Sequence, residues 1–214
     1  SRINEAPRFH GMIVQLPLPD QVSEETVIEA INPDKDVDGL HPANMGRLMA
    51  GMARFVPGTP AGVQQMLIRT GHDPSGQHVV ICGRSNIVGK PLANLLMQRL
   101  EGANSTVTVC HTRTRELVDL TRQADVIVAA MGVPEFVTGD MVKEGVVAID
   151  VGINRVDAPE RKRGYKLVGD IHYESVAEKA AAITPVPGGV GPMTIAMLLS
   201  NTLKAARHSI HPEA

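Results

Sequence analysis

The clearest pattern in the sequence is a series of short apolar runs that alternate with amphipathic stretches. The runs occupy residues 78–83, 106–111, 125–132, 146–152 and 181–186. The intervening amphipathic stretches cover 91–100, 114–124 and a region that begins near Thr138. Runs that are apolar at successive positions predict strands buried on both faces. Strands that alternate with helices predict βαβ units with right-handed crossovers, and therefore an α/β fold with a doubly wound parallel sheet.

The region before Thr59 has a different pattern. The apolar run 11–19 ends in two prolines and predicts one short buried strand, and the next stretch predicts a helix capped by Ser23. A loop rich in carboxylates, 32–42, follows. We therefore place a boundary at Thr59, between 1–58 and the regular alternation of 59–184, and treat the final stretch 185–214 as a third segment.

Two further helices are predicted from caps and spacing. One has Thr59 as its N-cap, Pro60 in its first turn, and an end at Gly71. The other is amphipathic and closes the chain over 195–210.

Composition and charge narrow the class of protein. The 214 residues are 43% apolar and 2% aromatic, with a formal net charge of -2 and no dense run of Lys or Arg. This argues against a nucleic-acid partner. No apolar run approaches the roughly 18 residues of a membrane span, and the N-terminus lacks the order of a secretory signal. We therefore expect a cytoplasmic protein in which Cys82 and Cys110 are free, buried thiols.

The stretch "VVICGRSNIVGKP" (79–91) resembles a dinucleotide-binding turn in which one glycine is replaced. Gly83 ends the predicted strand, Gly89 returns six residues later, and Ser85 stands in place of the middle glycine of G-x-G-x-x-G. Such a turn brings backbone close to a pyrophosphate at a helix N-terminus. A plain strand-to-helix turn without a ligand is the alternative.

The end of the second strand favours NADP over NAD. NAD-specific sites usually place an acid there to bind the ribose hydroxyls. The residues "HTRTR" after this strand include Thr112, Arg113 and Arg115 but no acid, and Arg84 lies in the turn itself. Guanidinium groups bind a 2′-phosphate, whereas a carboxylate repels it. The alternative is that Arg113 and Arg115 are ordinary surface residues.

Five motifs in one order resemble a known family. They are "VQLPLP", "KDVDGLHP", "GRSNIVGKP", "IDVGIN" and "TPVPGGVGPMT". Together they are similar to the methylenetetrahydrofolate dehydrogenase/cyclohydrolase family. The resemblance implies NADP-dependent oxidation of 5,10-methylenetetrahydrofolate and hydrolysis of the methenyl product to 10-formyltetrahydrofolate. It also implies a cytoplasmic homodimer of one-carbon metabolism that serves purine biosynthesis.

The resemblance assigns roles to the three segments and to individual residues. It makes 1–58 the remainder of a folate-binding catalytic domain, 59–184 a Rossmann-type NADP-binding domain, and 185–214 a cleft loop and returning helix. Gln15 is implied to support a catalytic lysine, and Asp38 to hold the pterin ring, because a carboxylate accepts paired hydrogen bonds. The implied folate contacts are Asp36, Pro187, Gly188 and Gly189. The implied cofactor contacts are Gly83, Arg84, Ser85, Ile87, Gly89, Thr112, Ile153, Gly191 and Thr194.

Simpler roles stand beside these assignments. Gln15 can satisfy backbone at a strand end, and Asp36 and Asp38 can be turn residues or a weak cation site. Asp150 and Asn154 are interpreted as residues that fix loops, and His172 is given no role. The histidines lack metal-ligand spacing, so no metal site is predicted.

The family's catalytic lysine belongs to a Y-x-x-x-K motif upstream of "VQLPLP", and the ten residues before Gly11 hold neither Lys nor Tyr. The sequence is therefore expected to start partway along a longer natural chain, with apolar faces of the folate domain exposed. Two alternatives stay open. One is a non-catalytic NADP-binding fragment, and the other is an NADP-dependent reductase of a small hydroxy or keto acid.

Overall fold

The computed structural model describes residues 2–210 and contains the predicted parallel sheet. The five strands are β1 (His78–Cys82), β2 (Thr106–Cys110), β3 (Val126–Ala129), β4 (Val147–Asp150) and β7 (Ala182–Ile183). They pair in parallel in the order β2-β1-β3-β4-β7. The chain first winds outward from β1 to β2 and then crosses back to β3, so the switch point lies between β1 and β3. The doubly wound α/β class predicted from the sequence is confirmed.

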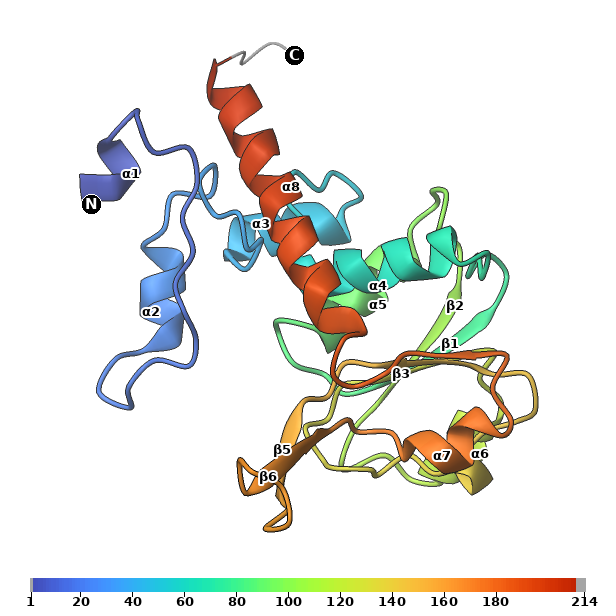
Figure 1. Ribbon diagram of the computed structural model, residues 1–214. Helices are drawn as coiled ribbons and strands as arrows, with labels where there is room; N and C mark the ends of the chain where they lie inside the picture. The colour runs from blue at the N-terminus through green and yellow to red at the C-terminus, as the bar shows by residue number, and fades with distance from the viewer. Residues whose placement is uncertain (1, 211–214) are drawn as a thin grey trace.

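Helices cover both faces of the sheet (Figure 1). On one side lie α4 (Gly58–Arg69), α5 (Gly89–Leu96) and α8 (Val190–Ile210), and on the other α6 (Leu117–Arg122) and α7 (Tyr173–Ala177). Strand alternation divides the core accordingly. Val79 and Ile81 pack with α4 and α5, whereas Val80 and Cys82 pack toward α6 and α7. Both faces of β1 are therefore buried, as its uninterrupted apolar run predicts.

The two cysteines face each other across adjacent strands as free, buried thiols, in agreement with the expectation from the sequence. Cys82 and Cys110 are register partners in the β1–β2 ladder. Desolvation in the core raises the pKa of Cys82 to about 12, with smaller contributions from Cys110 and Asp170. Burial likewise raises the pKa of Cys110. These thiols are core residues and not nucleophiles.

The N-terminal segment extends away from the sheet as an arm (Figure 1). It contains α1 (Arg2–Glu5) and α2 (Glu24–Glu29), followed by α3 (Pro42–Met49) next to the body. Ser23 caps α2 as predicted, because its hydroxyl accepts the backbone N–H of Thr26. Lys35 ties α1 to the carboxylate-rich loop by donating to the carbonyls of Ile3 and Ala6 at 2.9 and 2.8 Å.

The predicted strand over 11–19 is wrong. Only Met12 forms a bridge, with Asp36, and the rest of the run is irregular. Pro17 and Pro19 lack the N–H groups that a longer ladder needs, and Ile13 is 47% exposed. The predicted helix near Thr138 is also wrong, since only the single 3-10 turn η1 (Gly139–Met141) forms. Gly145, with φ of +76°, turns the chain into β4 soon afterwards.

Two predicted helix starts are corrected by the structure. Helix α4 starts at Gly58 with Pro57 in the N-cap position, so Thr59 is not a cap. Helix α6 starts at Leu117, because the Thr114 hydroxyl accepts the N–H of His111 and closes the turn after β2 instead.

The C-terminal helix begins earlier than predicted and carries an exposed apolar row. Helix α8 starts at Val190 and not at Ile195. Ile195, Leu199 and Leu203 recur every four residues on it and are 58%, 65% and 53% exposed. The expectation of exposed apolar faces is confirmed for this helix. Residues 1 and 211–214, at the outer ends of the first and third predicted segments, lie outside the described residues.

Five elements were not predicted, namely the short helix α1, two further helices and the two strands of a hairpin. Helix α3 is capped by the His41 ring, which accepts the N–H of Ala43 at 3.0 Å. Helix α7 is capped by His172, a residue for which no role was predicted. The strands β5 (Asn154–Asp157) and β6 (Tyr165–Val168) form an antiparallel hairpin beside the sheet. Their charged, alternating sequences are typical of a solvent-facing ribbon and lack the apolar runs of the main strands.

Candidate active site

The turn after β1 is built so that only glycine fits at its two ends. Gly83 has a φ of +133°, and a Cβ there would lie 2.1 Å from the carbonyl oxygen of Ala130. A Cβ on Gly89 would lie 2.1 Å from the carbonyl oxygen of Gly83. The turn therefore packs directly on the chain that leaves β3, at the switch point where doubly wound sheets bind ligands.

Hydrogen-bond donors in this turn are available to a ligand. Among the described residues, the backbone N–H groups of Ser85, Asn86 and Ile87 find no acceptor. The Ser85 hydroxyl oxygen accepts the N–H of Val88 at 3.1 Å, which leaves its own proton free to donate. Arg84 is exposed and forms no ion pair within residues 2–210. Free N–H groups and a free guanidinium at a helix start suit the phosphates of a dinucleotide.

The turn after β2 contains the residues that were predicted from the sequence to bind the 2′-phosphate. Thr112 and Arg113 are exposed in a turn held by the His111 ring, whose Nδ1 accepts the N–H of Arg113 at 3.1 Å. The turn lies next to Arg84, because β1 and β2 are adjacent and Gly83 donates its N–H to the carbonyl of Cys110.

Three large apolar side chains are exposed along this edge of the sheet. Ile87, Val133 and Ile153 follow β1, β3 and β4, and are 46%, 41% and 61% exposed. Flat apolar contacts of this kind suit the ring faces of a dinucleotide. The sequence assigned Ile87 and Ile153 to the cofactor but missed Val133. The available signal was the run "AAMGVP", in which a valine follows a glycine directly after a buried strand.

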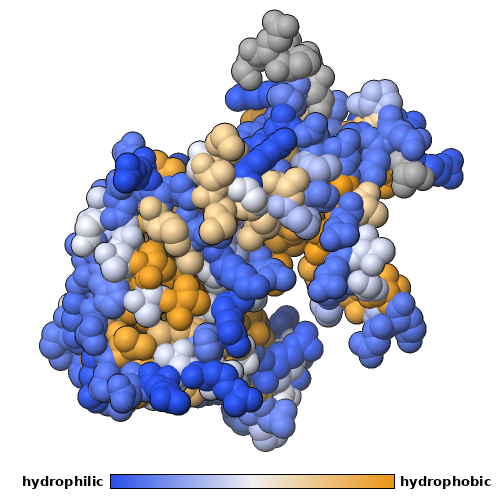
Figure 2. All heavy atoms as spheres, turned by 180° about the vertical axis from the view of Figure 1, so that it is seen from behind, coloured by the Kyte–Doolittle hydropathy of each residue, from blue (hydrophilic) through white to orange (hydrophobic). Residues whose placement is uncertain are grey.

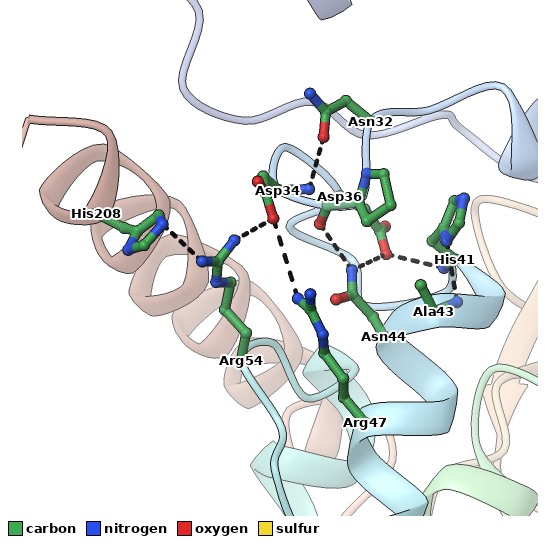
Figure 3. Close-up of polar contacts among 10 residues, drawn as sticks. Asn32, Asp34, Asp36, His41, Ala43, Asn44, Arg47, Arg54 and His208 are labelled. Atoms are coloured by element: carbon green, nitrogen blue, oxygen red, sulfur yellow. Dashed lines mark hydrogen bonds and ion pairs between the residues drawn. The ribbon is translucent and has the colours of Figure 1, made fainter. Parts of the chain in front are cut away.

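The carboxylate-rich loop separates its acids into different environments (Figure 3). Asp36 is 1% exposed, and its Oδ2 accepts the N–H of His41 and the side-chain amide of Asn44, both at 2.8 Å. Asp34 points the opposite way and pairs with Arg54. Asp36 is therefore occupied in shaping the loop, and its predicted contact with a folate stays a prediction.

Asp38 differs from its neighbours because its carboxylate is free. It is half-buried, and within residues 2–210 it accepts no hydrogen bond. Desolvation raises its pKa to about 6, with a further contribution from the charge of Asp36. A partly desolvated carboxylate without a donor is suited to receive N–H groups from a ligand.

A cavity lies between the arm and the cofactor turn. It has a volume of about 330 Å³ and is lined by Leu16 and Leu40 from the arm side and by Asn86 and Ile87 from the turn, together with residues of α2. Figure 2 shows the hollow that separates the arm from the body. Gln15, directly before Leu16, is exposed and donates to the carbonyl of Leu16 at 3.0 Å.

The loop before α8 also approaches this edge of the sheet. Pro187 follows a cis peptide bond, and Gly188 has a φ of +102° with open space around its Cβ position. Gly189 is tighter, because a Cβ there would lie 2.5 Å from the carbonyl oxygen of Pro185. Gly191 and Thr194, which the sequence placed in the same loop, belong instead to the first turns of α8.

Neither a metal centre nor a membrane helix is found in the described chain. Residues 2–210 contain no group of three or more His, Cys, Asp or Glu side chains placed to hold a metal ion. None of the helices in this range is long and apolar enough to cross a bilayer.

This arrangement defines a dinucleotide-binding α/β protein with a cavity between its cofactor turn and its N-terminal arm. The chain belongs to the tetrahydrofolate dehydrogenase/cyclohydrolase family. Residues 57–210 match the family's NAD(P)-binding domain, and residues 1–38 match its catalytic domain.

Relatives and solved structures of the same family agree over nearly the whole chain. The bifunctional protein FolD of Syntrophus aciditrophicus (strain SB) is 59% identical over 209 residues, which cover 98% of this chain and 71% of that relative. FolD of Salinibacter ruber is 61% identical over 205 residues, covering 96% and 68% of the two chains.

Two crystal structures have the same fold. The Campylobacter jejuni FolD structure has a TM-score of 0.89 at 48% identity, covering 97% of this chain and 70% of that one. The Trypanosoma brucei FolD structure, complexed with NADP cofactor and inhibitor, has a TM-score of 0.91 at 40% identity, covering 98% and 71%.

Proposed function

We propose that this chain oxidises 5,10-methylenetetrahydrofolate with NADP and hydrolyses the resulting methenyl cation to 10-formyltetrahydrofolate. The observation that carries the proposal is the cavity between the cofactor turn, at Asn86 and Ile87, and the carboxylate-rich loop, at Leu40. The turn has free donors and Arg84, and Asp38, two residues before Leu40, is a desolvated carboxylate without a partner among the described residues. The chain's membership of a family of folate enzymes with an NAD(P)-binding domain supports this assignment.

On the folate side, Asp38 is proposed to hold the pterin ring. The 2-amino-pyrimidinone edge of a pterin donates two parallel N–H groups, and a carboxylate accepts both. Binding returns to Asp38 the hydrogen bonds that desolvation removed. Asp36 supports this geometry by holding the carboxylate-rich loop in place through its hydrogen bonds with His41 and Asn44.

On the cofactor side, the turn 83–89 fits a pyrophosphate, because its glycines leave no Cβ between backbone and ligand. Arg84 and Thr112 are proposed to bind the 2′-phosphate, which is the group that distinguishes NADP from NAD. Ile87 and Ile153 are proposed to contact the rings. NADP, when bound, supplies the acceptor for the hydride that leaves the methylene carbon of the folate.

The protein contributes alignment to the oxidation and proton handling to the hydrolysis. Asp38 and the glycine turn fix their ligands from opposite sides of the cleft, which brings donor and acceptor carbons together. Hydrolysis adds water to the methenyl carbon and releases a proton, so it needs a nearby acid/base group. Gln15 is proposed to orient that group.

Other assignments also rest on the family resemblance. We propose that the catalytic part ends near residue 58, and that the protein works as a homodimer in the cytoplasm and supplies purine biosynthesis. The homodimer is tested by measuring the mass in solution with light scattering, where a monomer at working concentration would contradict it.

The deciding experiment is a spectrophotometric assay with methylenetetrahydrofolate, in which NADPH and the methenyl product are followed separately. NADP-dependent turnover without methenyl accumulation supports both activities. Accumulation of the methenyl product supports the dehydrogenase only. Bound NADP without turnover would contradict the proposal and leave a cofactor-binding protein.

Gln15→Ala separates the two steps. Because Gln15 is exposed and, within residues 2–210, its side chain bonds only to the neighbouring Leu16 carbonyl, its removal should leave the fold intact. We expect hydrolysis to be impaired more than hydride transfer. Gln21→Ala, at another exposed position of the arm, is the matched control. Equal loss of both steps in Gln15→Ala would contradict the assigned role.

A further inference from the structure

Asp170 is a fully buried carboxylate that connects two loops at the cofactor edge. It is 0% exposed and follows β6. Its Oδ2 accepts the N–H groups of Met131 and Gly132, at 2.6 and 2.8 Å, from the loop after β3. Its Oδ1 accepts, at 2.9 Å, the side-chain amide of Asn154, the first residue of β5, which directly follows the loop after β4. One carboxylate therefore sets the spacing of two loops that are remote in sequence.

A second buried acid holds Asp170 in place. Asp150, at the end of β4 and 3% exposed, accepts the N–H groups of Gly152 and Asp170, both at 2.9 Å, and that of Ile171 at 2.8 Å. Its pKa is raised, chiefly by desolvation, against the lowering effect of these three N–H donors. Within residues 2–210 neither Asp150 nor Asp170 has a cationic partner.

Glycines make room for these carboxylates. A Cβ on Gly152 would lie 2.2 Å from Asp170 Oδ1, and a Cβ on Gly169 would lie 1.8 Å from Asp150 Oδ2. The two loops therefore meet through these carboxylates, which occupy the space that side chains at positions 152 and 169 would otherwise fill. Because buried charges are costly unless every lone pair is satisfied, such an arrangement tolerates few alternative geometries.

The loops held in this way present two of the three exposed apolar side chains described at the cofactor edge. Ile153 lies between Gly152, bonded to Asp150, and Asn154, bonded to Asp170. Val133 follows Gly132, whose N–H is bonded to Asp170. Although both side chains are largely exposed, the backbone on at least one side of each is anchored.

We propose that Asp170 is a positioning residue for the cofactor site, acting through Asn154 and Gly132 to hold Ile153 and Val133 where they meet the dinucleotide. Being fully buried, Asp170 itself touches no cofactor. The inference rests on the proposed function, because it requires this edge to bind NADP.

The test uses the Asn154–Asp170 pair, because its hydrogen bond can be broken and then restored with reversed polarity. In Asn154→Asp two carboxylates face each other and repel, so the bond is lost. In the double variant N154D/D170N the carboxamide at 170 donates to the carboxylate at 154, while its oxygen still accepts from Met131 and Gly132. The number of bonds and the net charge are then those of the original protein. Asn154→Ala removes the bond without adding charge.

The measurement is the Kd for NADP by calorimetry, together with the thermal unfolding midpoint without ligand. We expect Asn154→Asp and Asn154→Ala to raise the Kd by about tenfold, the size of one lost hydrogen bond to a charged group. The double variant should return the Kd to within about threefold of the original value. Arg155→Ala, at the adjacent exposed position, is the matched control and should leave the Kd unchanged.

Two results would overturn the proposal. The first is an unchanged Kd in both single variants, and a lower unfolding midpoint in those variants would then make the pair structural only. The second is a double variant that binds NADP no better than Asn154→Asp. If the original protein itself fails to bind NADP, the proposed function is contradicted before the positioning role is tested.

Discussion

The hydroxyl groups of Thr59 and Thr194 lie 2.9 Å apart and join the first turns of α4 and α8. This contact explains why Thr59 does not cap its own helix. The two helices approach so closely that a Cβ on Gly58 would lie 3.0 Å from the carbonyl oxygen of Thr194. The start of α4, which leads into the sheet, is thereby fixed to the start of α8, which leaves the sheet.

Replacing either threonine by valine should cost about 0.5–1.5 kcal/mol of unfolding free energy, because one neutral hydrogen bond is lost. The double variant T59V/T194V should cost less than the sum of the two, since both changes remove the same bond. Urea denaturation followed by circular dichroism measures all three. Strict additivity would show that the hydroxyls do not interact. A rise in the Kd for NADP in Thr194→Val alone would support the predicted cofactor contact of Thr194.

Gly62 should not accept a side chain. A Cβ there would lie 3.0 Å from the Cβ of Met193 on α8. We expect Gly62→Val to lower the unfolding free energy by about 1–3 kcal/mol through overpacking. Gly46→Ala, in α3 with nothing within 4 Å, is the matched control. That change should stabilise by roughly 0.5–1 kcal/mol, because alanine is the better helix former. Equal effects at both positions would rule out the close helix contact.

Folate binding should depend on pH through Asp38. Its pKa is raised from 3.8 to about 6, so the folded state holds the proton more tightly than the unfolded chain does. The stability contributed by Asp38 is therefore present at low pH and is lost as pH rises through 6. Ligand binding has the opposite sign, because only the ionised carboxylate accepts both pterin N–H groups.

We expect kcat/KM for the folate to fall about tenfold for each pH unit below 6. Asp38→Asn should lower kcat/KM by about 10- to 100-fold at pH 7.5, because a carboxamide accepts through one oxygen only. It should also abolish the bend in the pH profile. Asp20→Asn, at an exposed position of the arm, should change neither. A bend that persists in Asp38→Asn would assign it to another group.

Arg84 should determine the preference for NADP. Its free guanidinium lies next to the turn after β2, so Arg84→Ala should raise the Kd for NADP by about 10- to 100-fold, the range of charge-assisted hydrogen bonds. The Kd for NAD, which lacks the 2′-phosphate, should change by less than about threefold. Arg99→Ala, an exposed arginine beyond α5, is the control. A parallel loss for NAD and NADP would place Arg84 at the pyrophosphate instead.

The sheet could be predicted from the sequence because its strands are buried on both faces and therefore contain uninterrupted apolar runs. The glycine turn could be predicted as well, since close backbone contact at Gly83 and Gly89 leaves a recognisable spacing. The hairpin β5–β6 could not, because a ribbon with one solvent face has charged residues at alternate positions. The strand predicted at 11–19 failed because apolar composition does not supply a neighbouring strand to pair with.

The buried acids illustrate a different limit. Asp150 and Asp170 look like loop residues in the sequence, since nothing local shows that both are buried. Their roles depend on N–H groups contributed by segments 20–40 residues away. Likewise, Thr59 is a reasonable cap by sequence, but its hydroxyl bonds to that of Thr194, 135 residues away. Side chains whose partners are remote are therefore the ones that local patterns assign wrongly.

Helix α8 starts directly after the Gly188–Gly189 loop and passes beneath the carboxylate-rich loop. There the side-chain amide of Asn201 donates to two carbonyls. One is that of Val37, the residue between Asp36 and Asp38, at 2.9 Å, and the other is that of Val56, at 2.8 Å. One helix of 21 residues thus connects the Gly188–Gly189 loop with the loop that carries Asp38. A ligand that restricts the motion of this helix at one end reduces the conformational entropy that the helix loses when a second ligand binds at the other end. Folate and NADP should then each increase the affinity for the other by the same factor.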